Sequence, residues 1–284
     1  MRIRSSFAVV FLVAATLVSG AWAQEAKFGA PKEFTLALGD SLAFGYQAEK
    51  VLRNPFDLAQ FHTGFAFVFA KRLAQTAPGA RAQLLNYGCP GETTGSFLTG
   101  PCLYQAAGFP LHAGYRGSQI DAAEALLAGQ HGQVSPILIS LGANDVLALL
   151  ALCPGLDPRC VGATLPGILE GVGRNLNQTL ARLRAVAPDA EIVLLQLYNP
   201  LALGFPDSDG LALSLNKVIG EVAAAHRARV ANAFPPFNLG PQPATLCSLT
   251  LICTVFGDIH ASDAGYAVIA DLMFRAAGYD RFEH

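Results

Sequence analysis

The sequence predicts an α/β protein with a mostly parallel sheet that helices cover on both faces. Two observations carry this prediction. The segments expected to form strands are apolar along their whole length, as is typical of strands buried on both faces. Segments whose apolar residues recur at three- and four-residue steps, as in helices, alternate with them along the chain. The chain has 284 residues, of which 52% are hydrophobic, and shows no internal repeat or linker. A single domain over 24–284 is therefore the simpler organisation.

In the first half of the chain, FTLALG at 34–39 is a short apolar run that ends in glycine and predicts the first strand. The spacing of apolar residues predicts a helix over 65–77 and another over 119–129. Apolar runs at 82–87 and 136–142 predict the second and third strands.

In the second half, helical spacing predicts helices over 165–188 and 211–228. An apolar run at 191–198 predicts the fourth strand, and RVANAF at 229–234 a short fifth one. The last predicted helix, 262–278, begins at a Ser-Asp cap and ends at a glycine. Long segments rich in Gly, Pro and Cys are left as loops, and loops of this length on a compact domain are usually functional.

The N-terminus has the features of a secretory signal peptide over 1–23. Arg2 and Arg4 precede an apolar stretch, FAVVFLVAATLVSG, and AWA at 21–23 is a small-x-small cleavage site before Gln24. The apolar stretch is short for a membrane span, and no later segment reaches spanning length without Gly, Pro or charge. We therefore expect a protein secreted to the extracellular space or the periplasm, without stable membrane insertion.

The six cysteines agree with export, because an even count in an oxidising compartment indicates disulfides. They fall into three couples of near neighbours, each in a region with Gly or Pro. Pairing within the couples would close three loops, although other connectivities are open. The expected pairs are Cys89–Cys102, Cys153–Cys160 and Cys247–Cys253. No grouping of Cys and His has the usual spacing of a zinc site.

Polar or glycine-bearing segments follow the predicted strands at one edge of the sheet. In a parallel sheet, ligands bind outside the carboxyl ends of the strands. Ser41 follows the first strand, and NYGCPGETT at 86–94 follows the second. GAND at 142–145 follows the third, and FGDIH at 256–260 precedes the last helix. Singly, each has an ordinary explanation as a helix cap or a turn. Together they predict one site at this edge.

These segments hold the groups that a serine nucleophile requires. A hydroxyl is a weak nucleophile and needs a base, a group that orients the base, and donors for the oxyanion that forms. Ser41 can supply the nucleophile and a backbone N–H, and Gly91 a second N–H, since no side chain obstructs its backbone. The amide of Asn144 can donate a third bond, and His260 is the candidate base.

The chain resembles the GDSL, or SGNH, hydrolases. The resemblance rests on GDSLAFG, NYGCPGETT, GAND and a late DIH followed by DAGYAVIA, which look like the four sequence blocks of that family, in order, from residue 34 to about 277. It implies a flavodoxin-like three-layer α/β/α sandwich with a five-stranded sheet, and hydrolysis of esters or thioesters without a metal or other cofactor. It also implies Ser41 as nucleophile, His260 as general base, and an oxyanion hole formed by the Ser41 N–H, Gly91 and Asn144.

The group that orients His260 is left open by the sequence. The family usually has Asp three residues before the catalytic histidine, where this chain has Gly257, and Asp258 lies two residues before it. Either the Asp258 carboxylate or the Gly257 carbonyl could accept the second ring N–H. We expect Asp258, because a carboxylate beside this histidine is otherwise unexplained.

The segment after Asn144 indicates the substrate. It places Val146, Leu147 and Leu150 beside the predicted site, and an apolar wall suits a short-to-medium acyl chain or a lipid-like ester. A buried helix would give the same pattern. The sequence thus predicts a secreted serine esterase or lipase. A carbohydrate acetyl esterase is the alternative enzyme, and a non-catalytic ligand-binding protein on the same fold is the alternative from a different class.

The composition limits the partners of the chain. Only 14% of the residues are charged, the formal net charge is −2, and no Lys/Arg cluster is present, so nothing indicates a nucleic-acid partner. Sparse charge leaves room for exposed apolar surface, which is compatible with transient contact with lipid. A small-molecule ester is therefore the expected partner, and the oligomeric state is left open.

Overall fold

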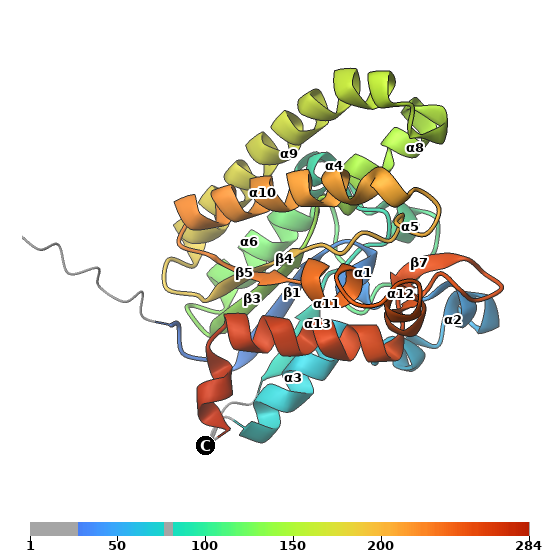
Figure 1. The fold of residues 1–284 in the computed structure, drawn as a ribbon. Coiled ribbons are helices and arrows are strands. Elements are labelled where there is room, and N and C mark those ends of the chain that lie inside the picture. The colour runs from blue at the N-terminus through green and yellow to red at the C-terminus, as the bar shows by residue number, and fades with distance from the viewer. Residues whose placement is uncertain (1–27, 77–81, 284) are drawn as a thin grey trace, which may run out of the picture.

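The computed structural model describes residues 28–76 and 82–283, and its centre is a five-stranded sheet (Figure 1). All strand pairs are parallel, in the order β2-β1-β3-β4-β5. The strands are β1 (Phe34–Gly39), β2 (Gln83–Asn86), β3 (Val134–Ser140), β4 (Ile192–Gln196) and β5 (Arg229–Asn232). The predicted strands are therefore present, and their bounds differ from the expected ones by at most two residues.

Helices cover both faces of this sheet and form the outer layers seen in Figure 1. α3 (Phe65–Thr76) and α13 (Asp263–Ala276) pack together on one face. α6 (Gln119–Gly129), α9 (Pro158–Val186) and α10 (Asp209–Ala225) lie on the other. The predicted α/β three-layer fold is confirmed.

Burial on both faces explains why the strands lack polar alternation. All seven residues of β3 are buried, and in β1 only Phe34 is not fully buried. Fully buried side chains of the helices complete the core, such as Ile269 and Met273 of α13. The core therefore lies in two layers, one on each face of the sheet.

The segments expected to be loops hold short helices and a two-stranded hairpin. Those nearest the sheet edge are α1 (Ser41–Phe44), α2 (Ala48–Arg53), α4 (Thr94–Thr99), α5 (Leu103–Ala106), α7 (Ala143–Leu147) and α8 (Leu149–Leu152). The C-terminal third adds α11 (Phe234–Asn238), α12 (Ala244–Leu249) and the antiparallel strands β6 (Thr250–Leu251) and β7 (Asp258–Ala261). Most are a turn or two long, too short for apolar periodicity to reveal them.

The start of α9 also differs from the expectation, because local capping extends the helix seven residues upstream of 165. The Asp157 side chain accepts a hydrogen bond from the Cys160 N–H at 3.0 Å, and Pro158 occupies the first helical position. Both features favour a helix start.

Disulfides close three of the segments at the carboxyl edge of the sheet. The pairs are those expected from near-neighbour spacing: Cys89–Cys102, Cys153–Cys160 and Cys247–Cys253. They connect the turn after β2 to α5, the end of α8 to α9, and α12 to the β6–β7 turn. By the chain-entropy estimate, closing such short loops contributes about 2–3 kcal/mol each to stability.

Two sequence predictions concern the N-terminus and membrane insertion. The predicted signal peptide, 1–23, lies outside the described residues. Among the helices of the described ranges, none has the length and apolar character needed to cross a bilayer.

Strand order fixes where a ligand can bind. In the order 2-1-3-4-5, the crossover direction reverses between β1 and β3, and ligands bind at the carboxyl ends of the strands beside that point. Gly39 and Ser140 pair at these ends. A Cβ at Gly39 would lie 1.8 Å from the Ser140 carbonyl oxygen, and the Gly39 φ is +118°, so this approach requires glycine.

Candidate active site

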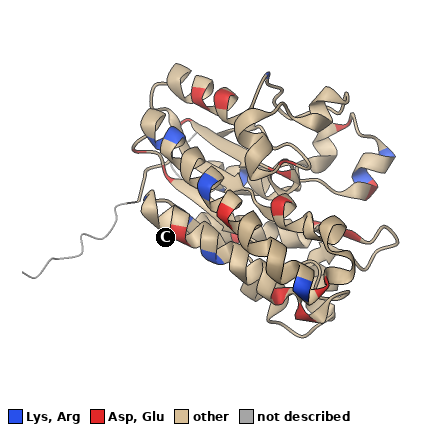
Figure 2. Cartoon of the chain, turned by 90° about the horizontal axis from the view of Figure 1, so that it is seen from above, with Lys and Arg blue, Asp and Glu red and all other residues tan. Residues whose placement is uncertain are grey.

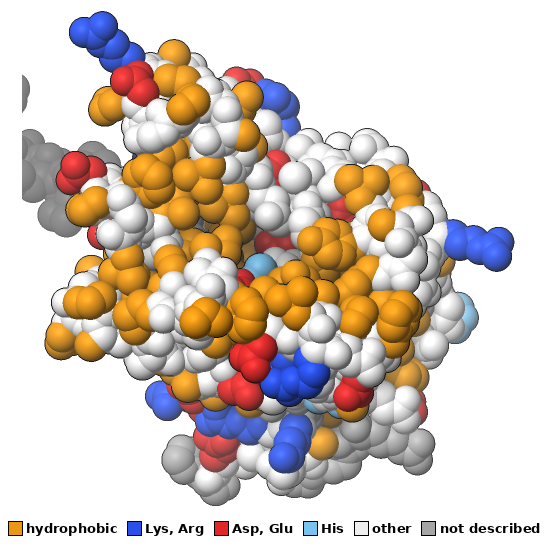
Figure 3. Space-filling view, turned by 90° about the vertical axis from the view of Figure 1, so that its right-hand side faces the viewer, with side chains coloured by type: hydrophobic (Ala, Val, Ile, Leu, Met, Phe, Trp, Pro, Cys, Tyr) orange, Lys and Arg blue, Asp and Glu red, His pale blue; other side chains and the backbone are white. Residues whose placement is uncertain are grey.

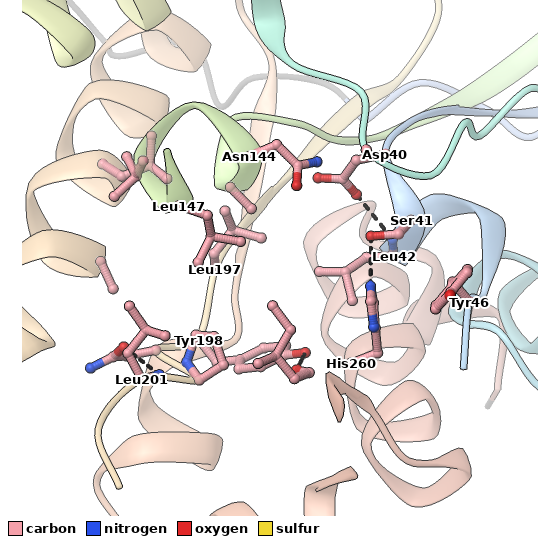
Figure 4. Close-up of a pocket in the computed structure, with 18 of the residues that line it drawn as sticks. Asp40, Ser41, Leu42, Tyr46, Asn144, Leu147, Leu197, Tyr198, Leu201 and His260 are labelled. Carbon is pink, nitrogen blue, oxygen red and sulfur yellow. Dashed lines mark hydrogen bonds between the residues drawn. The ribbon is translucent and has the colours of Figure 1, made fainter. Parts of the chain in front are cut away.

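Ser41 lies at the end of β1, as the first residue of α1. The helix is capped by the preceding residue, because Asp40 Oδ1 accepts a hydrogen bond from the Leu42 N–H at 3.0 Å. Asp40, and not Ser41, is therefore the residue that caps this helix. The Ser41 hydroxyl is left to point toward His260 (Figure 4).

Ser41, His260 and Asp258 form a continuous hydrogen-bonded series. His260 Nε2 lies 2.8 Å from Ser41 Oγ, and His260 Nδ1 lies 2.5 Å from Asp258 Oδ1. Both Asp258 and His260 belong to β7, and side chains two residues apart in a strand point to the same side. Strand geometry therefore brings the carboxylate beside the imidazole, and the ring nitrogen bonds Asp258 rather than the Gly257 carbonyl.

Asp258 accepts a hydrogen bond at each carboxylate oxygen. Oδ1 also accepts from the His260 backbone N–H at 3.1 Å, and Oδ2 accepts from the Ala48 N–H at 2.7 Å. Burial by itself would raise the pKa of Asp258. The bonds from His260 and Ala48, together with the charge of His260, outweigh burial and hold this pKa below its ordinary value. The group is therefore an ionised acceptor at neutral pH.

The hairpin strand that carries these two residues is fixed by contacts from distant elements. The Tyr198 hydroxyl donates to the Ile259 carbonyl at 2.8 Å, and Gln47 Nε2 donates to the Ala261 carbonyl at 2.9 Å. The Tyr46 ring packs on the His260 imidazole, with ring centroids 4.7 Å apart. Tyr46 and Tyr198 were missed from the sequence. Tyr198 follows β4, so the strand-end rule could have found it.

The predicted oxyanion donors meet at the same place. Ser41, Gly91 and Asn144 all line one cavity, although they follow three different strands. In the described part of the chain, the backbone N–H groups of Ser41 and Gly91 have no hydrogen-bond acceptor. Asn144 Nδ2 donates to the Glu92 carbonyl at 2.8 Å, which fixes the amide plane and leaves its second N–H available.

The turn after β2 and the helix after β3 are joined directly. Asp145 Oδ2 accepts from the Thr94 N–H at 2.9 Å, and its Oδ1 accepts from the Thr94 hydroxyl at 2.7 Å. Asn175 of α9 donates to the same hydroxyl at 3.0 Å. These bonds fix Asn144 relative to the turn that carries Gly91.

An apolar cavity of about 990 Å³, measured with its open mouth, lies beside Ser41. Figure 4 shows Leu147, Leu197 and Leu201 across it from Ser41 and His260. Val146 and Leu147 line the cavity, as predicted. The sequence did not single out the lining residues after β4 and on α10, which include Leu197, Tyr198, Pro200, Leu201, Leu211 and Leu215.

Leu150 was expected to line this cavity and does not. The chain passes from α7 to α8 at Ala148, and Leu149 is the residue of α8 that packs into the core. Leu150 lies on another side of that short helix, with 39% of its surface exposed.

The family is decided by a comparison with known sequences. Residues 37–268 match the model of the GDSL-like lipase/acylhydrolase family. The chain belongs to this family. Among curated proteins, none matches the chain. Within the described ranges of this GDSL-family hydrolase, no three His, Cys, Asp or Glu side chains are grouped so that they could hold a metal ion.

Solved structures share the fold at low identity. An acetylxylan esterase from Geobacillus stearothermophilus is 16% identical, with a TM-score of 0.58 over 89% of this chain and 97% of the esterase. An α/β hydrolase enzyme from the metagenome of Lake Arreo, Spain, is 19% identical, with a TM-score of 0.55 over 88% of this chain and 97% of that one.

Two buried carboxylates, Asp40 and Glu92, adjoin Ser41 and Gly91 in this GDSL-family hydrolase. Burial raises the pKa of Asp40 to about 6, although Ser140 Oγ donates to it. Burial also raises the pKa of Glu92 to about 7. Glu92 accepts from Ser96 Oγ at 2.5 Å and from Gln119 Nε2 at 3.2 Å. The Glu92 backbone carbonyl accepts from Asn144 Nδ2, so the bonds that hold the Glu92 side chain also help to position the Asn144 amide.

Asp258→Asn should lower kcat by up to about 10⁴-fold. Both carboxylate oxygens of Asp258 accept N–H bonds, so the amide nitrogen of Asn would meet another donor in either orientation. If this nitrogen faces His260, it forces the imidazole into the wrong tautomer. The measurement is kcat on a soluble p-nitrophenyl ester, with thermal unfolding to confirm the fold. A loss of only a few-fold would show that the carboxylate does not orient His260.

Asn144→Ala should lower kcat by roughly 10²–10³-fold with little change in KM, because the oxyanion forms only in the transition state. Asn175→Ala is the matched control, since it removes an amide from the same loop network but not from the cavity. Steady-state kinetics of both variants decide the matter. A kcat of Asn144→Ala close to that of the wild type would remove Asn144 from the oxyanion hole.

Glu92→Gln should make stability less dependent on pH. The native pKa of Glu92, about 7, lies above its ordinary value of 4.5, so the native state binds more protons between these pH values. The free energy of unfolding therefore falls as pH rises through this window, by at most about 3 kcal/mol. Urea unfolding at pH 5 and pH 8 measures the change.

Asp40 still titrates in Glu92→Gln. The plot of unfolding free energy against pH should therefore be shallower for this variant than for the wild type, but not flat. Parallel curves for wild type and Glu92→Gln would show that Glu92 is not protonated in the native state near neutral pH.

Proposed function

We propose that this GDSL-family hydrolase is a serine esterase that forms an acyl-enzyme on Ser41. Its substrates in this proposal are carboxylic esters with short-to-medium or lipid-like acyl chains. The observation that carries the proposal is the hydrogen-bonded series Ser41–His260–Asp258, which opens onto an apolar cavity.

The geometry supports a two-step reaction. His260 takes the proton of Ser41 as its Oγ attacks the ester carbonyl, and the Asp258 carboxylate stabilises the imidazolium that forms. The oxyanion lies toward the free backbone N–H groups and the Asn144 amide. His260 then gives the proton to the leaving alcohol. Water, activated by the same imidazole, releases the acid from Ser41. Each step uses groups of the chain itself.

The shape and lining of the cavity favour an acyl chain over a sugar. Its wall opposite Ser41 is built from Leu147, Leu197 and Leu201, and hydroxyl-rich ligands need more polar partners than such a wall offers. A carbohydrate acetyl esterase is the second candidate, because the acetylxylan esterase shares the fold. Its solved structures include catalytic mutants in which a serine or a histidine is replaced by alanine.

Turnover of p-nitrophenyl esters from acetate to decanoate tests the proposal. We expect kcat/KM to rise from acetate toward medium chains, because each added methylene can bury apolar surface in the cavity. Ser41→Ala should have no measurable turnover with its fold intact. Hydrolysis confined to acetylated oligosaccharides would favour the second candidate, and no ester turnover at all would favour a ligand-binding protein.

Leu201→Trp should shift the chain-length preference toward acetate, because the larger side chain occupies the cavity opposite Ser41. Leu203→Trp is the matched control, since Leu203 does not line the cavity and is 36% exposed. The ratio of kcat/KM for octanoate to that for acetate measures the shift. An unchanged ratio in Leu201→Trp would place the acyl chain elsewhere.

Secretion, as one domain over 24–284, is part of the same proposal. The three disulfides support an oxidising compartment, as does the signal-like segment 1–23. N-terminal sequencing of the exported protein should begin at Gln24. A start at Met1 would contradict processing at this site.

A further inference from the structure

Large apolar side chains are exposed around the hollow that leads to Ser41. Figure 3 shows hydrophobic side chains surrounding this hollow, with charged side chains at the margin of the face and in one mixed cluster of both signs below the apolar side chains. Four residues have the following exposed fractions: Leu103 72%, Leu152 58%, Val255 95% and Phe256 44%. We call these four residues the apolar rim. Isolated exposed apolar residues are ordinary, but a contiguous patch marks an interaction surface.

Each part of the apolar rim adjoins a residue of the site. Leu103 precedes Tyr104 of α5, whose ring lines the cavity. Leu152 ends α8, which follows directly on α7 and its cavity residues. Val255 and Phe256 lie in the turn that leads into Asp258. The rim comes from three separate segments that adjoin residues of the site, and α5, α8 and β7 lie toward the same side of the molecule in Figure 1, the side that faces the viewer in Figure 3.

Each part of the apolar rim lies beside a disulfide, just outside the loop that the disulfide closes. Cys102 directly precedes Leu103, Cys153 directly follows Leu152, and Cys253 is two residues before Val255. Each disulfide anchors one end of the segment that carries a rim residue, which restricts the conformations open to that segment.

Charge around the apolar rim indicates which surface it fits. The stretches 93–115, 146–156 and 235–257 contain no Asp, Glu, Lys or Arg. Figure 2 shows charged residues distributed mostly along the helices. Recognition of anionic membranes depends on Lys and Arg near the surface, and these stretches offer none. An uncharged apolar phase is the complementary partner.

We propose that the apolar rim docks this protein on the surface of an uncharged, water-insoluble ester phase, with the mouth of the cavity facing that phase. The ester chemistry rests on the proposed function, whereas the docking rests on the rim itself. In this position an acyl chain passes from the phase into the cavity without crossing water, and the leaving alcohol remains at the surface.

The test separates docking from turnover. Binding is measured by flotation of Ser41→Ala protein with triolein droplets, because this variant removes hydrolysis. In the same protein, Leu152→Ser with Val255→Ser should weaken droplet binding roughly tenfold or more, since two exposed apolar side chains no longer leave water. Binding of the parent should not depend on salt, because no charged group takes part.

Leu213→Ser is the matched control for the rim variant. Leu213 is 50% exposed on α10, and it lies two residues after Leu211, or about 200° around the helix from that cavity residue. This variant should bind droplets as the parent does. With Ser41 restored, all variants should hydrolyse soluble p-nitrophenyl butyrate within about twofold of wild type, and thermal unfolding should be unchanged.

Three results would overturn the proposal. The first is droplet binding that the rim variant leaves intact. The second is binding of the parent to anionic vesicles but not to triolein. The third is a parent that self-associates in sedimentation while the rim variant does not, because the rim would then join two copies. Failure of soluble-ester hydrolysis in the wild type would instead refute the proposed function and leave the binding result standing.

Discussion

The close approach of β1 and β3 at their carboxyl ends is the constraint on which the site depends. Gly39 lies so near the Ser140 carbonyl that no side chain fits between them. The Asp40 N–H donates to that carbonyl at 2.9 Å, and Ser140 Oγ donates to the Asp40 carboxylate at 3.0 Å. These contacts hold Ser41 on one side of the switch point and Asn144 on the other, so the sheet itself places the proposed nucleophile and the proposed oxyanion donor.

His260, the proposed base, is supported differently, because it lies outside the main sheet on a short hairpin. Distant groups compensate for this, namely the Tyr198 hydroxyl, the Gln47 amide and the Tyr46 ring. The Cys247–Cys253 disulfide closes the segment at its other strand. The orientation of His260 therefore depends on side chains that meet only after the whole domain has folded.

Each segment at the carboxyl edge of the sheet has two parts with different tasks. Their inner ends bring donors and the base to Ser41, and their outer ends expose the apolar rim. Buried carboxyl groups such as Glu92 accept hydrogen bonds that hold these segments. Burial disfavours their charged form, and this raises the pKa of Glu92. Burial thus favours the protonated form of Glu92, and the stability that this carboxyl contributes depends on pH.

Sequence by itself determined the strands, because runs buried on both faces carry no polar alternation, and it located Ser41 and His260 from the ordered blocks. Near-neighbour spacing also indicated the disulfide pairs. Only the tertiary structure chose Asp258 over the Gly257 carbonyl, because the direction of a side chain in an irregular segment depends on the strand that forms there. It likewise placed Leu201 in the cavity and Leu150 outside, since a cavity wall is assembled from elements far apart in the chain and proximity in sequence does not by itself bring a side chain to its surface.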